Sequence, residues 1–314
     1  MSAAGAAQGA TDLLPPSVRV IVRDWLSSNH VLLEHEDGNV LVDSGYVTAV
    51  PRTLALLAAS AAIDRRGVSL LVNTHCHSDH MGGNAAIAAR YGCAIAIPEG
   101  EAPLIQDWDQ QALLLAYADQ RADRFRADEL MKPGETRTWG NLPWQVLAAP
   151  GHDMGAVMLF SPEQGILISG DALWQNGFGF VMPREIDSAA LPAARATLDL
   201  IASLEVRVLV PGHGEPFTDV AASLEGAYAR LEKFERDPLR LASYAVKVLV
   251  AFLLLEKEGL ALAGLPRYLQ SVGIIRDFNA RFLRMTPELL AQWVIAELLR
   301  SRAAVCADGF LLPR

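Results

Sequence analysis

Three histidines and an aspartate lie within six consecutive positions, from His75 to His80. Imidazole nitrogens and carboxylate oxygens together suit a borderline metal ion such as zinc, and iron and manganese accept the same ligands. A solvated polar turn rarely collects this set of side chains. The segment 74–80, with the sequence THCHSDH, therefore predicts a metal site.

This segment is expected to lie on a loop between a strand and a helix. Residues 68–72 form a short apolar run that is typical of a buried strand, and a helix is predicted at 84–91 after two glycines. Alternate side chains of an extended segment share one face, so His75, His77 and Asp79 can converge.

Three further apolar runs each end in a side chain that can bind metal: His152, Asp171 and His213. Five of the seven histidines of the chain thus fall in loops flanked by Gly, Pro or Asp. Proteins build sites from loops on a rigid scaffold, so these strand ends are expected to meet at one edge of a pair of sheets.

The order and spacing of these residues resemble the metallo-β-lactamase superfamily over roughly residues 17–220. The residues that carry the resemblance are His75, His77, Asp79, His80, His152, Asp171 and His213, together with the early motif Leu41-Val42-Asp43-Ser44-Gly45. In that family the aspartate of the early motif braces the metal loop. The resemblance implies an α/β fold, a four-layer αββα sandwich with its metal site at one edge.

Carried over by position, the resemblance implies a first metal at His75, His77 and His152, a second at Asp79, His80 and His213, and Asp171 as a bridge. Two divalent ions are then the expected cofactors, with zinc first and iron or manganese as alternatives. Such a pair lies about 3.5–4 Å apart with a hydroxide between the ions, and it also polarises the oxygen of the substrate. Asp79 is the expected catalytic residue, which would orient the hydroxide and pass a proton to the leaving group.

Differences between subfamilies narrow the expected reaction. True β-lactamases of this fold usually carry a cysteine or serine where this chain has Asp171, whereas thioesterases such as glyoxalase II, lactonases and nucleases keep the aspartate. We therefore expect a binuclear metallohydrolase that cleaves a thioester, ester or lactone of a small molecule. The alternatives are a mononuclear iron oxidoreductase resembling the persulfide dioxygenases, a nucleic-acid-processing hydrolase, a β-lactamase-like side activity, and a binding protein without turnover.

Four side chains are candidates for the substrate pocket: Trp174, Phe178, Phe180 and His30. The first three follow Asp171 in a glycine-rich loop, where they could form an apolar wall, but ordinary packing explains them equally well. His30 flanks a strand, where a histidine is more often satisfied by its neighbours than used as a ligand. Cys76 is expected to point into the core, because it alternates with the ligands.

The chain is expected to divide into a tail and two domains. Residues 1–16 contain Ala, Gly and Pro without the basic start or apolar centre of a signal peptide, which predicts a flexible tail. Residues 17–220 hold the predicted strands and ligand loops. Residues 221–314 are mainly helical and end in a predicted hairpin at Asp308-Gly309, and together these features resemble a winged-helix module. An insertion at 101–131 is predicted to be helical, either as a lid or as a solvated helix.

The distribution of charge argues against nucleic acid as a partner. Residues 221–314 carry 13 Lys and Arg against 10 Asp and Glu, and the rest of the chain has a balance of −12. A domain this acidic repels a polyanion, so small neutral or cationic substrates fit better. The C-terminal part is then expected to serve as a pocket wall or as the surface of a homo-oligomer.

Composition is typical of a globular enzyme, with 51% hydrophobic and 20% charged residues in 314. The longest uninterrupted apolar run, 248–255, is far shorter than the roughly 20 residues of a membrane span, so no membrane partner is expected. Three widely spaced cysteines favour reduced thiols and a cytoplasmic location.

Overall fold

The computed structural model describes residues 9–314, so half of the predicted tail, residues 1–8, lies outside the described residues. Within the other half, Ala10 is buried and Leu14 packs against the hydrophobic core. The chain forms two compact units, one made of Met1–Asp109 with Ala122–Leu231 and the other of Gln110–Arg121 with Glu232–Arg314. The boundary at 220 and 221 that the sequence suggests falls at the start of a helix, and the second unit also takes a segment from the middle of the chain.

The first unit contains a six-stranded sheet whose order follows the chain: β1 (Val18–Ile21), β2 (His30–Leu33), β3 (Asn39–Val42), β4 (Val68–Val72), β5 (Ala94–Pro98) and β6 (Glu129–Met131). β1 to β3 pair antiparallel, and β3 to β6 pair parallel. Parallel neighbours need crossover connections. The connections from β3 to β4 and from β4 to β5 carry η1 (Val47–Ala49), α2 (Val50–Ala58), α3 (Ala61–Arg66), α4 (Ser78–Met81) and α5 (Asn84–Tyr91).

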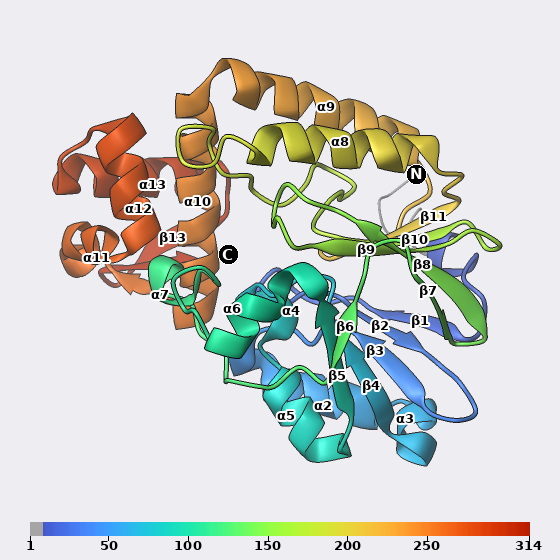
Figure 1. Ribbon diagram of the computed structural model, residues 1–314. Helices are drawn as coiled ribbons and strands as arrows, with labels where there is room; N and C mark the ends of the chain where they lie inside the picture. The colour runs from blue at the N-terminus through green and yellow to red at the C-terminus, as the bar shows by residue number, and fades with distance from the viewer. Residues whose placement is uncertain (1–8) are drawn as a thin grey trace. The chain divides into compact units, whose positions relative to one another are not determined.

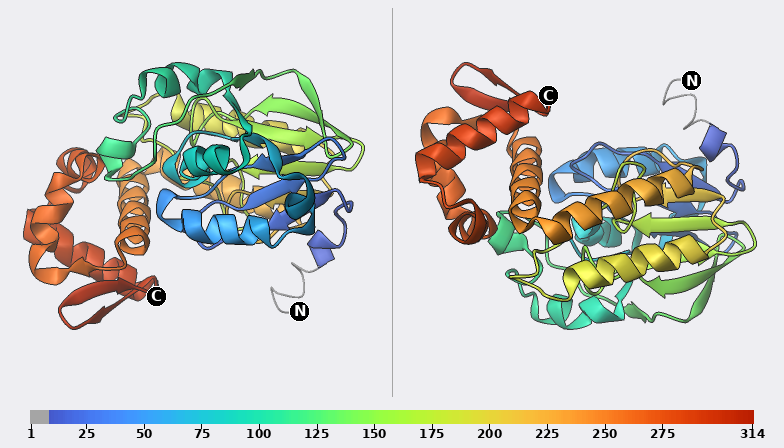
Figure 2. Two further views of the ribbon diagram at one scale, coloured as in Figure 1. Left: turned by 90° about the horizontal axis from the view of Figure 1, so that it is seen from below. Right: turned by 90° about the horizontal axis from the view of Figure 1, so that it is seen from above.

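A second sheet of five strands has the order β11, β10, β9, β8, β7, with bounds β7 (Thr136–Trp139), β8 (Leu142–Ala148), β9 (Val157–Ser161), β10 (Ile166–Gly170) and β11 (Val208–Pro211). Its pairs are antiparallel except β10 with β11, which α8 (Ala190–Ser203) connects. α9 (Val220–Arg236) follows β11 and lies beside α8, as Figure 1, the right-hand view of Figure 2 and the bond from the Tyr228 hydroxyl to Asp199 show.

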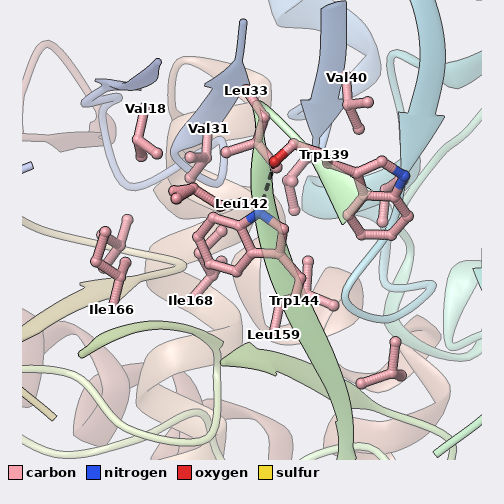
Figure 3. Packing of buried hydrophobic residues seen from close by; sticks show 14 of the residues in the cluster. Val18, Val31, Leu33, Val40, Trp139, Leu142, Trp144, Leu159, Ile166 and Ile168 are labelled. Carbon is pink, nitrogen blue, oxygen red and sulfur yellow. Dashed lines mark hydrogen bonds between the residues drawn. The ribbon is translucent and has the colours of Figure 1, made fainter. Parts of the chain in front are cut away.

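The two sheets pack face to face, and helices cover their outer faces (Figure 1). Side chains from both inner faces form one buried cluster, in which Val31 and Leu33 of the first sheet meet Trp144 and Leu159 of the second (Figure 3). The Trp144 indole N–H donates to the Trp139 carbonyl at 3.0 Å, so its polar atom is satisfied inside the core. Burying each large apolar side chain contributes about 1.5–3 kcal/mol. The predicted αββα sandwich is confirmed.

Strands β9 and β10 are buried along their whole length, because one face meets the other sheet while helices cover the opposite face. Strands buried on both faces have nearly continuous apolar sequences rather than alternating ones. The runs VMLFS and ILISG have this character, and β10 leads directly into the loop that begins with Asp171.

The second unit is mainly helical, with α7 (Leu115–Ala118), α10 (Pro238–Lys257), η3 (Leu262–Gly264), α11 (Leu265–Ser271), α12 (Gly273–Phe278), the π-helical turn η4 (Asn279–Leu283) and α13 (Pro287–Arg300). The predicted hairpin is confirmed as β13 (Ala304–Ala307) and β14 (Phe310–Pro313), and β12 (Leu260–Ala261) completes a three-stranded sheet. Asp308 and Gly309 both have positive φ, which is the requirement of a tight type I′ turn.

Helix α10 is long and apolar enough to cross a membrane by length and composition alone, with a mean hydropathy of 1.8 over its best window. Its buried side chains, which include Leu241, Leu249 and Leu253, also make it the core helix of the second unit. A core helix passes the same test, so the feature carries little weight for a membrane.

The insertion predicted to be helical over 101–131 is helical only in part. It contains η2 (Glu99–Glu101), α6 (Ala102–Asp107) and α7, and then runs without helix or strand to β6. Trp108, Leu114 and Asp119 adopt left-handed backbone conformations that end or precede these helices. The prediction was wrong here because charge alternation gives no sign of where a chain reverses direction.

Candidate metal centre

The loops that carry the predicted ligands are tied together by backbone hydrogen bonds. The Thr74 carbonyl, two residues after β4, accepts from the Val157 amide of β9, and the Gly212 amide after β11 donates to the Gly170 carbonyl of β10. The loop between β1 and β2 joins both sides, since its Ser28 amide donates to the Asp79 carbonyl and its Asn29 amide donates to the Gly212 carbonyl. One edge of the sandwich therefore holds all the ligand loops in fixed positions.

The structure brings the seven predicted ligands together in three overlapping groups whose ligand atoms lie within 4.8 Å of one another. The groups are His75, His77 and His152; His75, His80 and Asp171; and Asp79, His80 and His213. The first and third groups contain the same residues as the two metal sets that the resemblance implies.

Asp171 lies between these groups. Its Oδ1 atom is 3.3 Å from His80 Nε2 and 3.8 Å from His213 Nε2, whereas its Oδ2 atom is 3.5 Å from His152 Nε2. Burial would raise the pKa of Asp171, but His213 and His80 hold that pKa well below its usual range. The carboxylate thus turns one oxygen toward each group, as a bridging ligand would.

The protonation of the rings can be read from their partners. His152 Nδ1 donates to the Phe180 carbonyl at 2.6 Å, so its lone pair is on Nε2. His77 Nε2 faces the Asp153 carboxylate at 3.4 Å, which places its lone pair on Nδ1. The two lone-pair nitrogens, His77 Nδ1 and His152 Nε2, are 2.9 Å apart. Two acceptors this close are compatible when both point at a cation.

Asp43 braces the other side of the cluster. Its Oδ1 accepts from the Thr74 amide at 2.9 Å, and its Oδ2 accepts from the Thr74 hydroxyl and from His80 Nδ1, both at 2.8 Å. Burial would lower the pKa of His80, but Asp43 and Asp171 together raise it well above its usual value. Nε2 of His80 is left to face Asp171.

Several buried ring nitrogens in the cluster have no hydrogen-bond partner within residues 9–314, among them His75 Nε2 and His80 Nε2. Leaving a buried polar atom unpaired costs about 1–3 kcal/mol. Nitrogen and carboxylate donors arranged in this way match the ligands of zinc and iron sites. The residues present therefore fit divalent metal ions.

The four predicted pocket residues have different environments. Trp174 is half-buried, and its indole N–H donates to Asp171 Oδ1 at 3.2 Å. Phe178 and Phe180 are buried, and Phe180 packs edge-on against His152. His30 is fully buried against Arg23 and Thr53, and burial followed by the Arg23 charge lowers its pKa to about 3. Of the four predicted pocket residues, Trp174 alone is exposed enough to contact a substrate.

Sequence reasoning missed Trp25, which lies in the loop between β1 and β2. Trp25 is 58% exposed, and its ring stacks on the His213 ring, with centroids 5.4 Å apart and planes at 3°. Trp174 meets Trp25 edge-on at 5.4 Å. The only signal in the sequence was one tryptophan a few residues before a strand, which does not identify a site.

Comparison with known proteins identifies the same family that the candidate ligands resemble. Residues 23–213 match the sequence profile of the metallo-beta-lactamase superfamily. A hydroxyacylglutathione hydrolase from Hyphomonas neptunium is 31% identical over 157 residues, which are 50% of this chain and 52% of that protein. The chain thus matches about half the length of its curated relatives.

Two solved structures are similar in fold. A beta-lactamase domain protein from Burkholderia ambifaria has a TM-score of 0.58 at 22% identity, over 96% of this chain and 93% of that one. A second protein, solved in a di-iron-bound form, has a TM-score of 0.52 at 25% identity, over 67% of this chain and 98% of that one. With the profile match covering more than half of its length, this chain belongs to the metallo-beta-lactamase superfamily.

Proposed function

We propose that this superfamily hydrolase cleaves a thioester or ester of a small, apolar acyl group at a centre of two divalent ions, with zinc as the first candidate and iron or manganese as alternatives. The observation that carries the proposal is the position of Asp171, whose two oxygens face different histidine groups. The relatives named hydroxyacylglutathione hydrolase support a thioester as substrate.

The seven side chains would hold the two ions in the sets that share Asp171. When bound, such ions supply a nucleophilic water at neutral pH and polarise the carbonyl that it attacks. Asp79 is suited to carry the proton, since its side chain is still 16% exposed while its Oδ2 lies 3.1 Å from His213 Nε2. It can therefore exchange protons at the reacting centre and with the solvent. A general acid or base in this position contributes about 10²–10⁴-fold to the rate.

Trp25 and Trp174 would bind the acyl group. They form an aromatic corner around His213, and Trp25 keeps more than half of its surface exposed. Aromatic side chains beside a few polar groups are typical of small-molecule sites. Thioesters with apolar or aromatic acyl groups are therefore expected to be better substrates than charged ones.

The proposal is tested with a panel of acyl thioesters, acyl esters and lactones, including a hydroxyacyl glutathione, together with a count of the metals in the purified protein. We expect turnover that is lost on chelation and falls about 10²-fold or more in Asp79→Asn. Asp64→Asn, on the exposed end of α3, is the matched control. One iron per chain and oxygen uptake with a persulfide would instead support the dioxygenase alternative. A cytoplasmic location and a homo-oligomer remain predictions.

A further inference from the structure

Two acidic side chains beside the metal centre, Asp153 and Glu101, have no part in the proposed reaction. Asp153 follows the ligand His152 directly, and Glu101 ends the short turn η2. Glu101 is only 2% exposed, although a glutamate is rarely buried unless its carboxyl group is paired with another group. The contacts of these two side chains indicate what they do.

Asp153 faces the ring of His77. Asp153 Oδ2 lies 3.4 Å from His77 Nε2, and both side chains are nearly buried, at 13% and 11% exposed. The other nitrogen of the same ring, Nδ1, points toward His152. A histidine that binds metal with one nitrogen commonly donates its second N–H to a carboxylate, which fixes the ring and makes the ligand more basic.

Asp153 is itself held from two directions. Its Oδ1 accepts from the Gly155 amide at 2.7 Å, and the carboxyl group of Glu101 lies against the same loop at Gly155. Two neighbouring buried carboxyl groups share one proton, because both cannot be ionised at low cost. Burial and then the Asp153 charge raise the pKa of Glu101 well above its usual value, which favours a protonated Glu101 whose O–H can donate to Asp153.

Two glycines make this contact possible. A Cβ atom added to Gly155 would lie 2.1 Å from Glu101 Oε1, and one added to Gly100 would lie 2.8 Å from the Gly155 Cα atom. The two loops therefore approach at a distance that tolerates no side chain. Glycine at positions 100 and 155 therefore allows the Glu101 side chain to lie close to the Asp153 loop.

We propose that Asp153 orients the His77 ring for the first metal and that Glu101 holds Asp153 in position. The inference rests on the proposed metal centre. It gives His77 a brace equivalent to the one that Asp43 provides for His80, so each of the two metal sets has its own carboxylate support. Asp153 and Glu101 are positioning residues and do not touch the substrate.

The test compares Asp153→Ala, Glu101→Ala and Glu101→Gln with the wild type. Zinc affinity is measured by competition with a chelator, the geometry of the ligands by the absorption spectrum of the cobalt-substituted protein, and folding by thermal unfolding without metal. Glu99→Ala is the matched control, since Glu99 lies in the same turn but is half exposed and pairs with Lys132.

We expect Asp153→Ala to weaken zinc binding about 10–100-fold and to change the cobalt spectrum. Glu101→Ala should do the same to a smaller extent. Glu101→Gln should stay within about threefold of the wild type, because its amide N–H replaces the O–H that donates to Asp153. Glu99→Ala should have no effect.

The proposal is overturned if Asp153→Ala keeps the zinc affinity and cobalt spectrum of the wild type, or if Glu101→Gln is as defective as Glu101→Ala. If either alanine variant does not fold, Asp153→Asn and Glu101→Gln decide: the first must weaken zinc binding while the second preserves it. A wild-type protein that binds no metal would overturn the metal centre itself, which separates the two failures.

Discussion

Each imidazole of the first metal set is oriented by a partner on its second nitrogen. His152 donates to a carbonyl, His77 faces Asp153, and His75 Nδ1 lies 3.2 Å from the Thr74 hydroxyl. The sequence predicted the seven candidate ligands that the structure brings together, because their types and order are distinctive. It could not predict which nitrogen of each ring is free, because that depends on residues far apart in the chain.

A substitution of Asp43 tests whether this residue supports His80, a member of the second metal set. Replacing it with Ala leaves the buried Thr74 amide and His80 Nδ1 without acceptors, and it places Ala at a φ of 59°. We expect a loss of about 2–4 kcal/mol in the free energy of unfolding, measured by urea denaturation of the metal-free protein. Asp37→Ala, whose side chain is 93% exposed, should change it by less than about 0.5 kcal/mol. Equal stability of the two variants would show that Asp43 braces nothing.

His30 gives a prediction about pH. Because burial lowers its pKa in the folded protein to about 3, the unfolded chain takes up a proton near pH 6.5 that the folded protein excludes. The contribution of this neutral histidine is fully present above pH 6.5 and is lost as the pH falls toward 3. We expect the stability advantage of the wild type over His30→Gln to shrink by up to about 1.4 kcal/mol per pH unit below 6.5. Urea denaturation at a series of pH values measures it, and a constant advantage would contradict the burial of a neutral His30.

At the scale of elements, the buried strands were the most predictable and the loops the least. β4, β10 and β11 are short apolar runs that end in ligands, so their position could be predicted from the sequence. The chain around Trp108 and Asp119 could not, because its left-handed residues carry no glycine signal. Trp25 could not be identified from the sequence either, because hydrogen bonds to residues near 80 and 212, far away in the chain, determine the position of its loop.

The loop between β1 and β2 is expected to take part in substrate binding through Trp25. Trp25→Ala removes an exposed ring that stacks on His213 and does not contribute to the core. We expect KM for an apolar acyl thioester to rise about 5–30-fold with kcat changed by less than about threefold, because burying such a surface contributes about 1–2 kcal/mol. Leu239→Ala, half exposed in the second unit, is the control. An unchanged KM would place the acyl group elsewhere.

At the scale of the whole molecule, the chain enters the second unit twice. The segment Gln110–Arg121 belongs to that unit, where Arg121 binds the buried Glu256, Tyr117 binds Asp277 and Asp119 binds Tyr268. The sequence indicated a helical C-terminal domain and its hairpin, which the structure contains. It gave no indication of this excursion, because pairs separated by more than 100 residues leave no local pattern.

Removal of residues 232–314 should therefore affect more than the C-terminal unit. The segment 110–121 would lose the side chains to which it is bonded, and a buried partner such as Glu256 would no longer hold Arg121. We expect the truncated chain to be cut by protease within 110–121 at least about tenfold faster than the full chain. Equal resistance of the two chains would show that the segment is held independently of the second unit.

The central claim is that Asp171 joins two metal sets into one hydrolytic centre. The most direct measurement is the metal content and thioester turnover of the wild type beside Asp171→Ala, both loaded with zinc and freed of excess. We expect about two zinc ions per wild-type chain, at most one in the variant, and a loss of turnover of about 10²-fold or more. Equal metal content and turnover in the two proteins would contradict it.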